Sequence, residues 1–438
     1  MRFDHLQHHL AHQVSRRNLL KAGAAGTAAA ALSGSVLSGV AGASGGDDDD
    51  WDDQTGPRTG QYDDSFSSAG ALDGSWAKET SARYGKNDQR GTLNEITAKK
   101  TARALDLACG HQTKTVIMGH MLRNGVAAYQ AVPQRRFEQR ITKLGYVAKD
   151  PAKWFTTTAT GLAGEDLWRT ADRTSGPLGY DQGSTAFGKN QLSGHEERFP
   201  EGGTYQIATQ LDGLAHIGVK EVFYNGWRAP DFATPEAVTK LGIEHVGPIV
   251  TRGVLLDVLS LKLAKSPSDT QKIEGRPMLA KTYRITIEDL QAAMKMGGIK
   301  KIEPGDVVVI RTGWNQLAEL DLEMSGGTDG KGPFAAMYLG TEPGIYVREA
   351  KWLAEHRPAI VASDSWALEV LGHAVNGDGN AFPVHNELIA HHGIRIGEGV
   401  VSDGLVAHGV SEFCYCYMPN HAYGATAGCT APFALIKA

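Results

Sequence analysis

Hydrophobic and polar positions follow two different periods along much of the chain. Short runs of apolar, often β-branched residues predict buried strands, and apolar residues three and four positions apart predict helices that face a core. The expected strands cover 113–119, 249–259, 307–311, 359–363 and 413–417, and the expected helices cover 94–108, 286–296, 347–356 and 386–392. Strands interleaved with helices predict an α/β fold, with a mixed sheet and flanking helices.

The stretch from about 122 to 202 differs from the rest because it is polar and rich in glycine and serine. This composition predicts long loops, and such loops in a folded domain usually form lids or interfaces. We therefore expect one folded domain over 76–438 that carries a loop-rich insertion at about 122–202.

The first residues predict an export signal rather than a part of the fold. Arg16 and Arg17 precede a weakly hydrophobic run over 22–40, and Ala41 and Ala43 fit a small-residue cleavage site. The pattern resembles a twin-arginine signal peptide at 1–43, and its glycine and serine content is too high for a membrane span. An acidic linker follows over 44–75. We expect a periplasmic or secreted protein, exported by the twin-arginine route, with no membrane contact after the signal is cleaved.

The length and net charge of the chain indicate which kinds of partner it is able to bind. The chain has 438 residues, of which 41% are hydrophobic, and a formal net charge of −5. The length suffices for a sizeable core, and the negative charge argues against nucleic-acid binding through bulk electrostatics.

The spacing of the four cysteines fits no metal site: they are Cys109, Cys414, Cys416 and Cys429. We therefore expect buried free thiols, and a disulfide from Cys429 stays open.

Candidate chemistry is concentrated in residues 203–225. Gln206, Gln210, Asp212 and His216 fall at even offsets, so a strand directs them to one side, and the pairs four residues apart also share a helical face. A carboxylate and an imidazole brought together in this way form an acid/base or metal-ligand pair. The alternative is structural, with Asp212 as a cap and His216 as a core histidine.

Four aromatic residues flank this segment. Tyr205, Phe223, Tyr224 and Trp227 lie near glycines, where they either stack on an aromatic substrate or pack a core. We take Tyr205, Tyr224 and Trp227 as candidate substrate-binding residues.

The segment resembles the signature of the cyclase family, metal-dependent hydrolases that include bacterial kynurenine formamidase and isatin hydrolase. The family pattern is H-x-G-T-H-x-D-x-P-x-H. In register, Gln206 and Gln210 occupy two histidine positions, whereas Thr209, Asp212 and His216 match. Further family landmarks occur in the right order over about 85–438, at 92–94, 252–257, 305–314, 352–364 and 424–426.

The resemblance implies a cyclase-like (swivelling β/β/α) fold and a metal site. Family members add a late histidine and glutamate as ligands, and Glu398 occupies the glutamate position. Counting back from Glu398 reaches Asn386, with His385 one residue away, so both stay candidates. His373, His391, His392 and His408 have no counterpart in the family pattern and are expected to be surface or core histidines.

The implied ligand set is Asp212, Glu398 and His385, completed by Gln206, Gln210 and water. Imidazole nitrogen suits zinc, whereas an amide oxygen is a weaker, harder donor. The resemblance therefore implies a divalent metal, manganese or zinc, and loss of the metal is the alternative.

The implied activity is hydrolysis of a carbon–nitrogen bond in a small-molecule amide, of the arylformamidase type that acts in tryptophan catabolism on N-formylkynurenine. A metal-activated water would attack the carbonyl, with His216 as the acid/base group. The alternatives are a metal-free binding protein and a lyase or lactonase on the same fold. The family also implies assembly as a homo-oligomer.

Overall fold

The computed structural model describes residues 61–110, 112–130, 134–145, 193–199 and 203–437. The predicted signal peptide, the acidic run within the predicted linker and most of the predicted insertion lie outside these residues. Within the described part of the chain, no helix is both long and apolar enough to cross a membrane.

A mixed sheet of nine strands forms the centre of the fold, in the order β1-β13-β11-β5-β8-β9-β10-β4-β12. The bounds are β1 Thr113–Ile117, β4 Gln210–Asp212, β5 Ile249–Asp257, β8 Val307–Arg311, β9 Ile360–Ser363, β10 Arg395–Glu398, β11 Glu412–Tyr417, β12 Ala427–Gly428 and β13 Phe433–Lys437. Neighbouring strands from β5 to β10 pair in parallel, and the remaining pairs are antiparallel. Two short hairpins accompany this sheet: β2 Arg140–Gly145 with β3 Ser193–Arg198, and β6 Thr270–Ile273 with β7 Arg276–Leu279.

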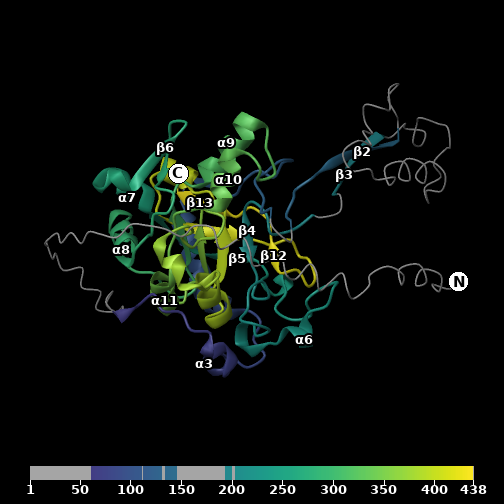
Figure 1. Cartoon of the computed structure of the whole chain (residues 1–438), viewed down its shortest axis with the longest axis vertical. Coiled ribbons are helices and arrows are strands. Elements are labelled where there is room, and N and C mark those ends of the chain that lie inside the picture. The colour runs from purple at the N-terminus through teal and green to yellow at the C-terminus, as the bar shows by residue number, and fades with distance from the viewer. Residues whose placement is uncertain (1–60, 111, 131–133, 146–192, 200–202, 438) are drawn as a thin grey trace. The chain divides into compact units, whose positions relative to one another are not determined.

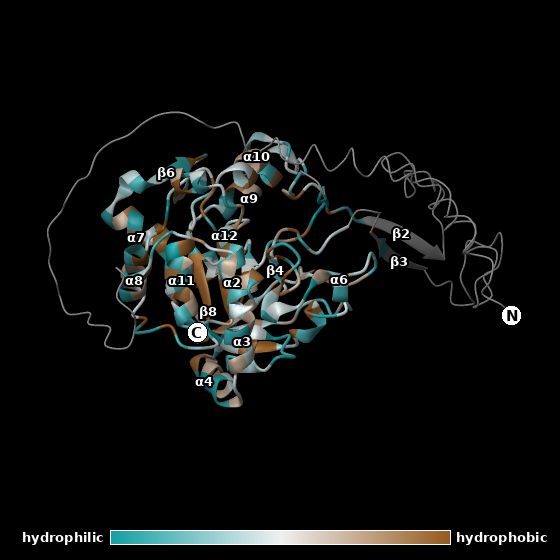
Figure 2. Cartoon of the chain, turned by 60° about the horizontal axis from the view of Figure 1, so that its bottom comes forward, coloured by the Kyte–Doolittle hydropathy of each residue, from teal (hydrophilic) through white to brown (hydrophobic). Residues whose placement is uncertain are grey.

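Both faces of the sheet are buried, which explains why its central strands have continuous apolar runs. In β8, Val308 and Ile310 belong to one core cluster, whereas Val307 and Val309 belong to another. Successive side chains of a strand point to opposite faces, so one strand supplies both clusters. Figure 2 shows β8 coloured as hydrophobic between the helices.

Helices cover the sheet, and several of them are labelled in Figure 1. Their bounds are α2 Ala69–Leu72, α3 Ser75–Tyr84, α4 Ala98–Ala108, α6 Ala229–Phe232, α7 Val258–Lys265, α8 Ile287–Met296, α9 Asn315–Ser325, α10 Pro333–Gly340, α11 Val347–Glu355, α12 Pro383–His385 and α13 Asp403–Ala407. In the described part of the chain, the 3₁₀ helices are η2 Gly91–Glu95, η4 Tyr224–Gly226, η5 Ile243–His245, η6 Pro267–Asp269 and η7 Ala374–Asp378, and η8 Asn386–His391 is a π-helix. Buried residues of α7, α8, α11 and η8 share the core cluster that contains Val308.

The predicted α/β class is confirmed, with small shifts at element ends. The helix predicted over 94–108 begins four residues later, because Thr97 caps α4 by accepting a hydrogen bond from the Lys100 amide. The strand predicted over 249–259 ends at Asp257, which caps α7 in the same way. The helix predicted over 286–296 is confirmed as α8, and Thr286 and Asp289 form a capping box at its start.

Residues 61–75, which we predicted as the end of the linker, are packed against the domain. They include α2, and Asp64 pairs with Arg284 at 2.6 Å while Asp63 pairs with Lys351 at 2.8 Å. All four cysteines are free, and the Sγ atoms of Cys414 and Cys416 lie 4.0 Å apart on β11. Cys414 and Cys416 are buried, as predicted, whereas Cys109 is exposed and Cys429 is partly exposed.

Candidate metal centre

The pairing of β4 with β10 brings the first two acidic groups together. Gln210 lies opposite Glu398 in the antiparallel register, and Asp212 is the last residue of β4. The chain leaves β4 through Gly213, whose amide donates to the Thr426 carbonyl at 2.8 Å. The segment that follows brings His216 back to Asp212.

His385 approaches these carboxylates from the short helix α12. Its Nδ1 lies 2.6 Å from an oxygen of Glu369, and its Nε2 lies 3.3 Å from Glu398 and 3.8 Å from Asp212. A carboxylate on one ring nitrogen fixes the tautomer and orients the other nitrogen as a metal ligand. The preceding Phe382 has a φ of 51°, a left-handed conformation that is strained in a residue with a Cβ and common at functional sites.

Asp212, His385 and Glu398 form a group that is able to hold a metal ion. Their ligand atoms lie within 4.8 Å of one another, and all three residues are buried. Asp212 has an exposed fraction of 0%, and among the described residues neither of its oxygens has a hydrogen-bond partner. A buried carboxylate without hydrogen bonds is costly unless a cation compensates it. The site therefore fits a divalent ion.

Electrostatic coupling within the centre shifts several pKa values. Burial raises the pKa of Glu398 to about 7, with a further contribution from the charge of Asp212. Burial alone would lower the pKa of His385, but hydrogen bonds to Glu369 and Glu398 raise it to about 10. Burial and the charge of Glu398 also hold the pKa of the nearby Glu342 well above its usual range. Such shifts are typical of a site crowded with acidic groups.

Gln210 and Gln206 connect Glu398 to His216 through a series of hydrogen bonds. The Nε2 of Gln210 donates to Glu398 and, at 2.9 Å, to the Oε1 of Gln206. The Nε2 of Gln206 lies 3.1 Å from the Nδ1 of His216. With Gln206 as the donor, the tautomer assigned to His216 carries its proton on Nε2. The structure therefore joins both glutamines to the centre.

His216 faces the carboxylates with that second nitrogen. Its Nε2 lies 4.0 Å from an oxygen of Asp212, and 18% of its side chain is exposed. Burial lowers the pKa of His216, and the charge of Asp212 opposes this shift only in part. The ring is thus neutral at pH 7 and is able both to accept and to donate a proton.

The structure brings His385, rather than Asn386, to the centre. The Asn386 amide group donates to the Phe382 carbonyl at 3.2 Å, whereas His385 lies among the carboxylates.

The three aromatic residues predicted to bind substrate lie in different environments. The Tyr224 hydroxyl is buried and donates to Asp88 at 2.8 Å, and the Trp227 indole donates to the Asp88 carbonyl at 3.4 Å. Tyr205 is 42% exposed and precedes Gln206. Packing therefore accounts for Tyr224 and Trp227, and the substrate-binding role of all three stays a prediction.

Several residues near the centre were missed by sequence reasoning. Tyr129 stacks on Trp366 at 5.5 Å, Trp366 meets Phe382 edge-on at 6.2 Å, and Phe382 meets the His385 ring at 5.4 Å. Arg135 lies over Tyr129, and its charge lowers the pKa of both Glu398 and His216. These residues come from separate parts of the chain, so no local motif contains them. The sequence offered one signal for Trp366, which is that the strand predicted over 359–363 gives way to a loop at 363–366.

The fold and the buried centre define an α/β protein with a carboxylate and imidazole site suited to a metal ion. Residues 179–370 match the family model named Cyclase. A crystal structure of a novel cyclase is 26% identical, with 82% of this chain and 98% of that chain covered and a TM-score of 0.58. These matches show that the chain is similar to the cyclase family and shares its fold.

More distant structures and the signal model complete the comparisons. Isatin hydrolase A from Ralstonia solanacearum is 14% identical, with 76% and 96% of the two chains covered and a TM-score of 0.44. An isatin hydrolase bound to the product analogue thioisatinate is 14% identical, with 78% and 99% covered and a TM-score of 0.45. The comparison with curated proteins gave no significant match. Residues 13–33 match the twin-arginine translocation signal, so the protein is exported by that route, to the periplasm or beyond.

Proposed function

We propose that this protein is an exported hydrolase that cleaves a carbon–nitrogen bond of an amide, with arylformamidase activity on an N-formyl aromatic amine of the N-formylkynurenine type. The observation that carries the proposal is the buried Asp212, which has no hydrogen bond among the described residues and lies beside His385 and Glu398. The match to the cyclase family model supports the same class of chemistry.

Asp212, His385 and Glu398 would hold a divalent ion. One imidazole nitrogen with carboxylate oxygens suits manganese or zinc, and the excess of oxygen donors favours manganese. A bound ion of this kind lowers the pKa of water and polarises a carbonyl oxygen. Gln210 holds Glu398 in place by its hydrogen bond, and Gln206 and Gln210 stay candidates for direct amide-oxygen ligands.

His216 is the residue that we assign to proton transfer. Gln206 holds its Nδ1, which leaves Nε2 directed toward Asp212. Burial keeps the ring neutral, and proton transfer at Nε2 requires the tautomer with the ring proton on Nδ1, where the Gln206 amide oxygen would accept it. Nε2 would then take the proton of the attacking water and give that proton to the leaving nitrogen. Proton transfer to the nitrogen is needed because an amide anion is a poor leaving group.

The aromatic chain from Tyr129 to Phe382 is the surface that we assign to the substrate ring. Tyr129, Trp366 and Phe382 are all partly exposed, and the chain of contacts ends at His385. Ring stacking of this kind contributes about 0.5–1.5 kcal/mol per pair beyond the buried area. The Arg135 guanidinium offers a partner for an anionic substituent on the substrate.

A metal-free binding protein on the same fold is the second candidate. It is favoured by the raised pKa of His385, because a protonated imidazole would balance part of the carboxylate charge without an ion. Lyase or lactonase activity is the remaining alternative on this fold.

Metal removal and reconstitution test the proposal. The exported protein is treated with a chelator, reloaded with Mn²⁺ or Zn²⁺, and assayed on N-formylkynurenine, isatin and a simple aryl lactone. We expect amide hydrolysis that is lost with the ion and restored by it. A protein that neither binds an ion nor responds to one would favour the binding-protein candidate, and exclusive activity on the lactone would overturn the amide assignment.

A further inference from the structure

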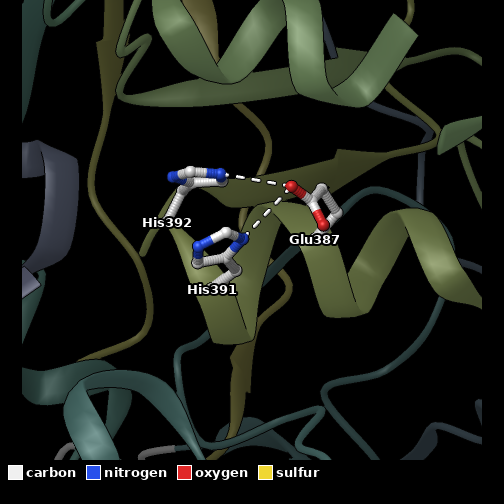
Figure 3. Close-up of side chains that lie close together, drawn as sticks. All are labelled: Glu387, His391 and His392. Atoms are coloured by element: carbon white, nitrogen blue, oxygen red, sulfur yellow. Dashed lines mark hydrogen bonds and ion pairs between the residues drawn. The ribbon is translucent and has the colours of Figure 1, made fainter. Parts of the chain in front are cut away.

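A second group of metal-ligand side chains lies just beyond His385 on the same helical segment. Glu387, His391 and His392 each offer one ligand atom, and these atoms lie within 4.8 Å of one another. One oxygen of Glu387 is 3.1 Å from the Nδ1 of His391 and 3.2 Å from the Nε2 of His392. Figure 3 shows both rings directed toward that carboxylate.

The π-helix explains how three residues of such close spacing converge. In η8 the His392 amide donates to the Glu387 carbonyl at 3.3 Å, a bond between residues five apart. In an α-helix a residue faces its neighbours three and four positions away, and the fifth residue turns aside. The wider π turn brings both the fourth and the fifth residue over Glu387. Single π turns inside helices occur frequently at functional sites.

A partner from α3 orients the first imidazole. The Nε2 of His391 lies 3.6 Å from an oxygen of Glu79, and its ring stacks on Trp76 at 4.3 Å. A ligating histidine typically donates its other ring N–H to a carboxylate, which fixes the tautomer and raises ligand basicity. Glu79 is therefore placed to leave the Nδ1 of His391 free for a cation.

The cluster is accessible from one side. Glu387 is buried, whereas the side chains of His391 and His392 are 17% and 23% exposed. Glu387, His392 and Glu79 also line a cavity of about 410 Å³. An ion is able to enter from this cavity, and a water from it is able to complete the coordination.

We propose that Glu387, His391 and His392 bind a zinc ion at a second site, distinct from the centre at Asp212. Two imidazole nitrogens and one carboxylate oxygen are typical zinc ligands, and a tetrahedral ion with bonds of about 2.0–2.2 Å separates its ligand atoms by about 3.3–3.5 Å. The observed separations from the Glu387 oxygen are slightly shorter than this, so a small movement of the side chains accommodates the ion. Through Glu79 and Trp76, the site would fasten α3 to the segment that carries His385.

Zinc binding to the full exported protein tests this inference. After chelation, each variant is equilibrated with Zn²⁺ alone, and bound zinc is measured by elemental analysis. We expect that His391→Gln combined with His392→Gln removes one zinc equivalent, whereas His408→Gln, at an exposed histidine elsewhere, removes none. The second-site equivalent should persist in Asp212→Asn combined with Glu398→Gln, so failure at one centre is separable from failure at the other.

A single substitution keeps the test informative if the double histidine variant misfolds. Glu79→Gln changes an exposed side chain, and it should lower zinc affinity at the second site by about 10–100-fold while circular dichroism stays unchanged. Zinc should also raise the melting temperature of Asp212→Asn combined with Glu398→Gln, and not after His391→Gln and His392→Gln are added. Unchanged zinc content in the double histidine variant would overturn the proposal and make the cluster a purely hydrogen-bonded one.

Discussion

At the residue scale, the neighbours of His216 determine what its ring is able to do. Gln206 occupies Nδ1 and Asp212 faces Nε2. We predict that His216→Ala lowers kcat on an N-formyl aromatic amine by about 10²–10⁴-fold, because a general acid/base is removed, while bound metal stays unchanged. Steady-state kinetics with elemental analysis check this, with His408→Ala as the control. Loss of the ion would instead make His216 a ligand.

His120 gives a pH-dependent prediction. Its Nε2 is buried and has no hydrogen bond among the described residues, and burial lowers its pKa from 6.5 to about 4. A lowered folded-state pKa means that stability is complete above the unfolded pKa and is lost as the pH falls from 6.5 toward 4. The nearby Asp403 opposes this shift only in part.

We therefore expect that His120→Leu weakens the acid sensitivity of the protein. At about 1.4 kcal/mol per pKa unit, His120 contributes about 3 kcal/mol of lost stability over that interval. Urea unfolding of wild type and variant at pH 7 and pH 4 measures the difference. An equal loss of stability in both proteins would show that His120 is solvated in solution.

Some residues of the centre could be predicted and others could not. Asp212, His216 and Glu398 could be located because their spacing in the chain fits a known motif. Glu369 and Arg135 act through contacts with residues far along the chain, so no pattern in the sequence indicates them.

At the element scale, the pairing of β4 with β10 places Gln210 opposite Glu398, and Gln210 donates in turn to Gln206. We predict that Gln206→His combined with Gln210→His raises zinc affinity about tenfold or more, because imidazole nitrogen binds zinc better than an amide oxygen. Competition titration with a zinc chelator measures the change, and Gln112→His, at an exposed position, should have no effect. Unchanged affinity would show that these side chains do not reach the ion.

The capping box of α8 gives a stability prediction. The Thr286 side chain accepts from the Asp289 amide at 3.2 Å, and the Asp289 carboxylate accepts from the Thr286 amide at 3.1 Å. Thr286→Ala should lower the free energy of unfolding by about 0.5–2 kcal/mol. Urea denaturation measures this, and an unchanged midpoint would contradict the cap's contribution.

Helix ends and irregular turns were the hardest elements to predict. The strand over 307–311 was predicted with the bounds that β8 has, since an apolar run between two turns defines it. The segment 386–392 was predicted as a regular helix, whereas η8 is a π-helix, because the extra residue per turn leaves the apolar pattern almost unchanged.

At the scale of the whole molecule, the α/β class followed from alternating strand and helix patterns. The order of the nine strands did not, because β4, β12 and β13 join the sheet through contacts between distant segments.

The chain's export also belongs to this scale. We predict that Arg16→Lys combined with Arg17→Lys retains the protein in the cytoplasm, since the signal depends on paired arginines. Cell fractionation with immunoblotting checks this, and unchanged export would contradict the twin-arginine assignment.

Anomalous diffraction from crystals of the exported protein grown with Mn²⁺ shows whether the centre at Asp212 holds a metal ion. We expect an anomalous peak bonded to Asp212, His385 and Glu398, and its disappearance in Asp212→Asn. A wild-type map in which these three side chains contact one another with no anomalous peak between them would contradict this expectation.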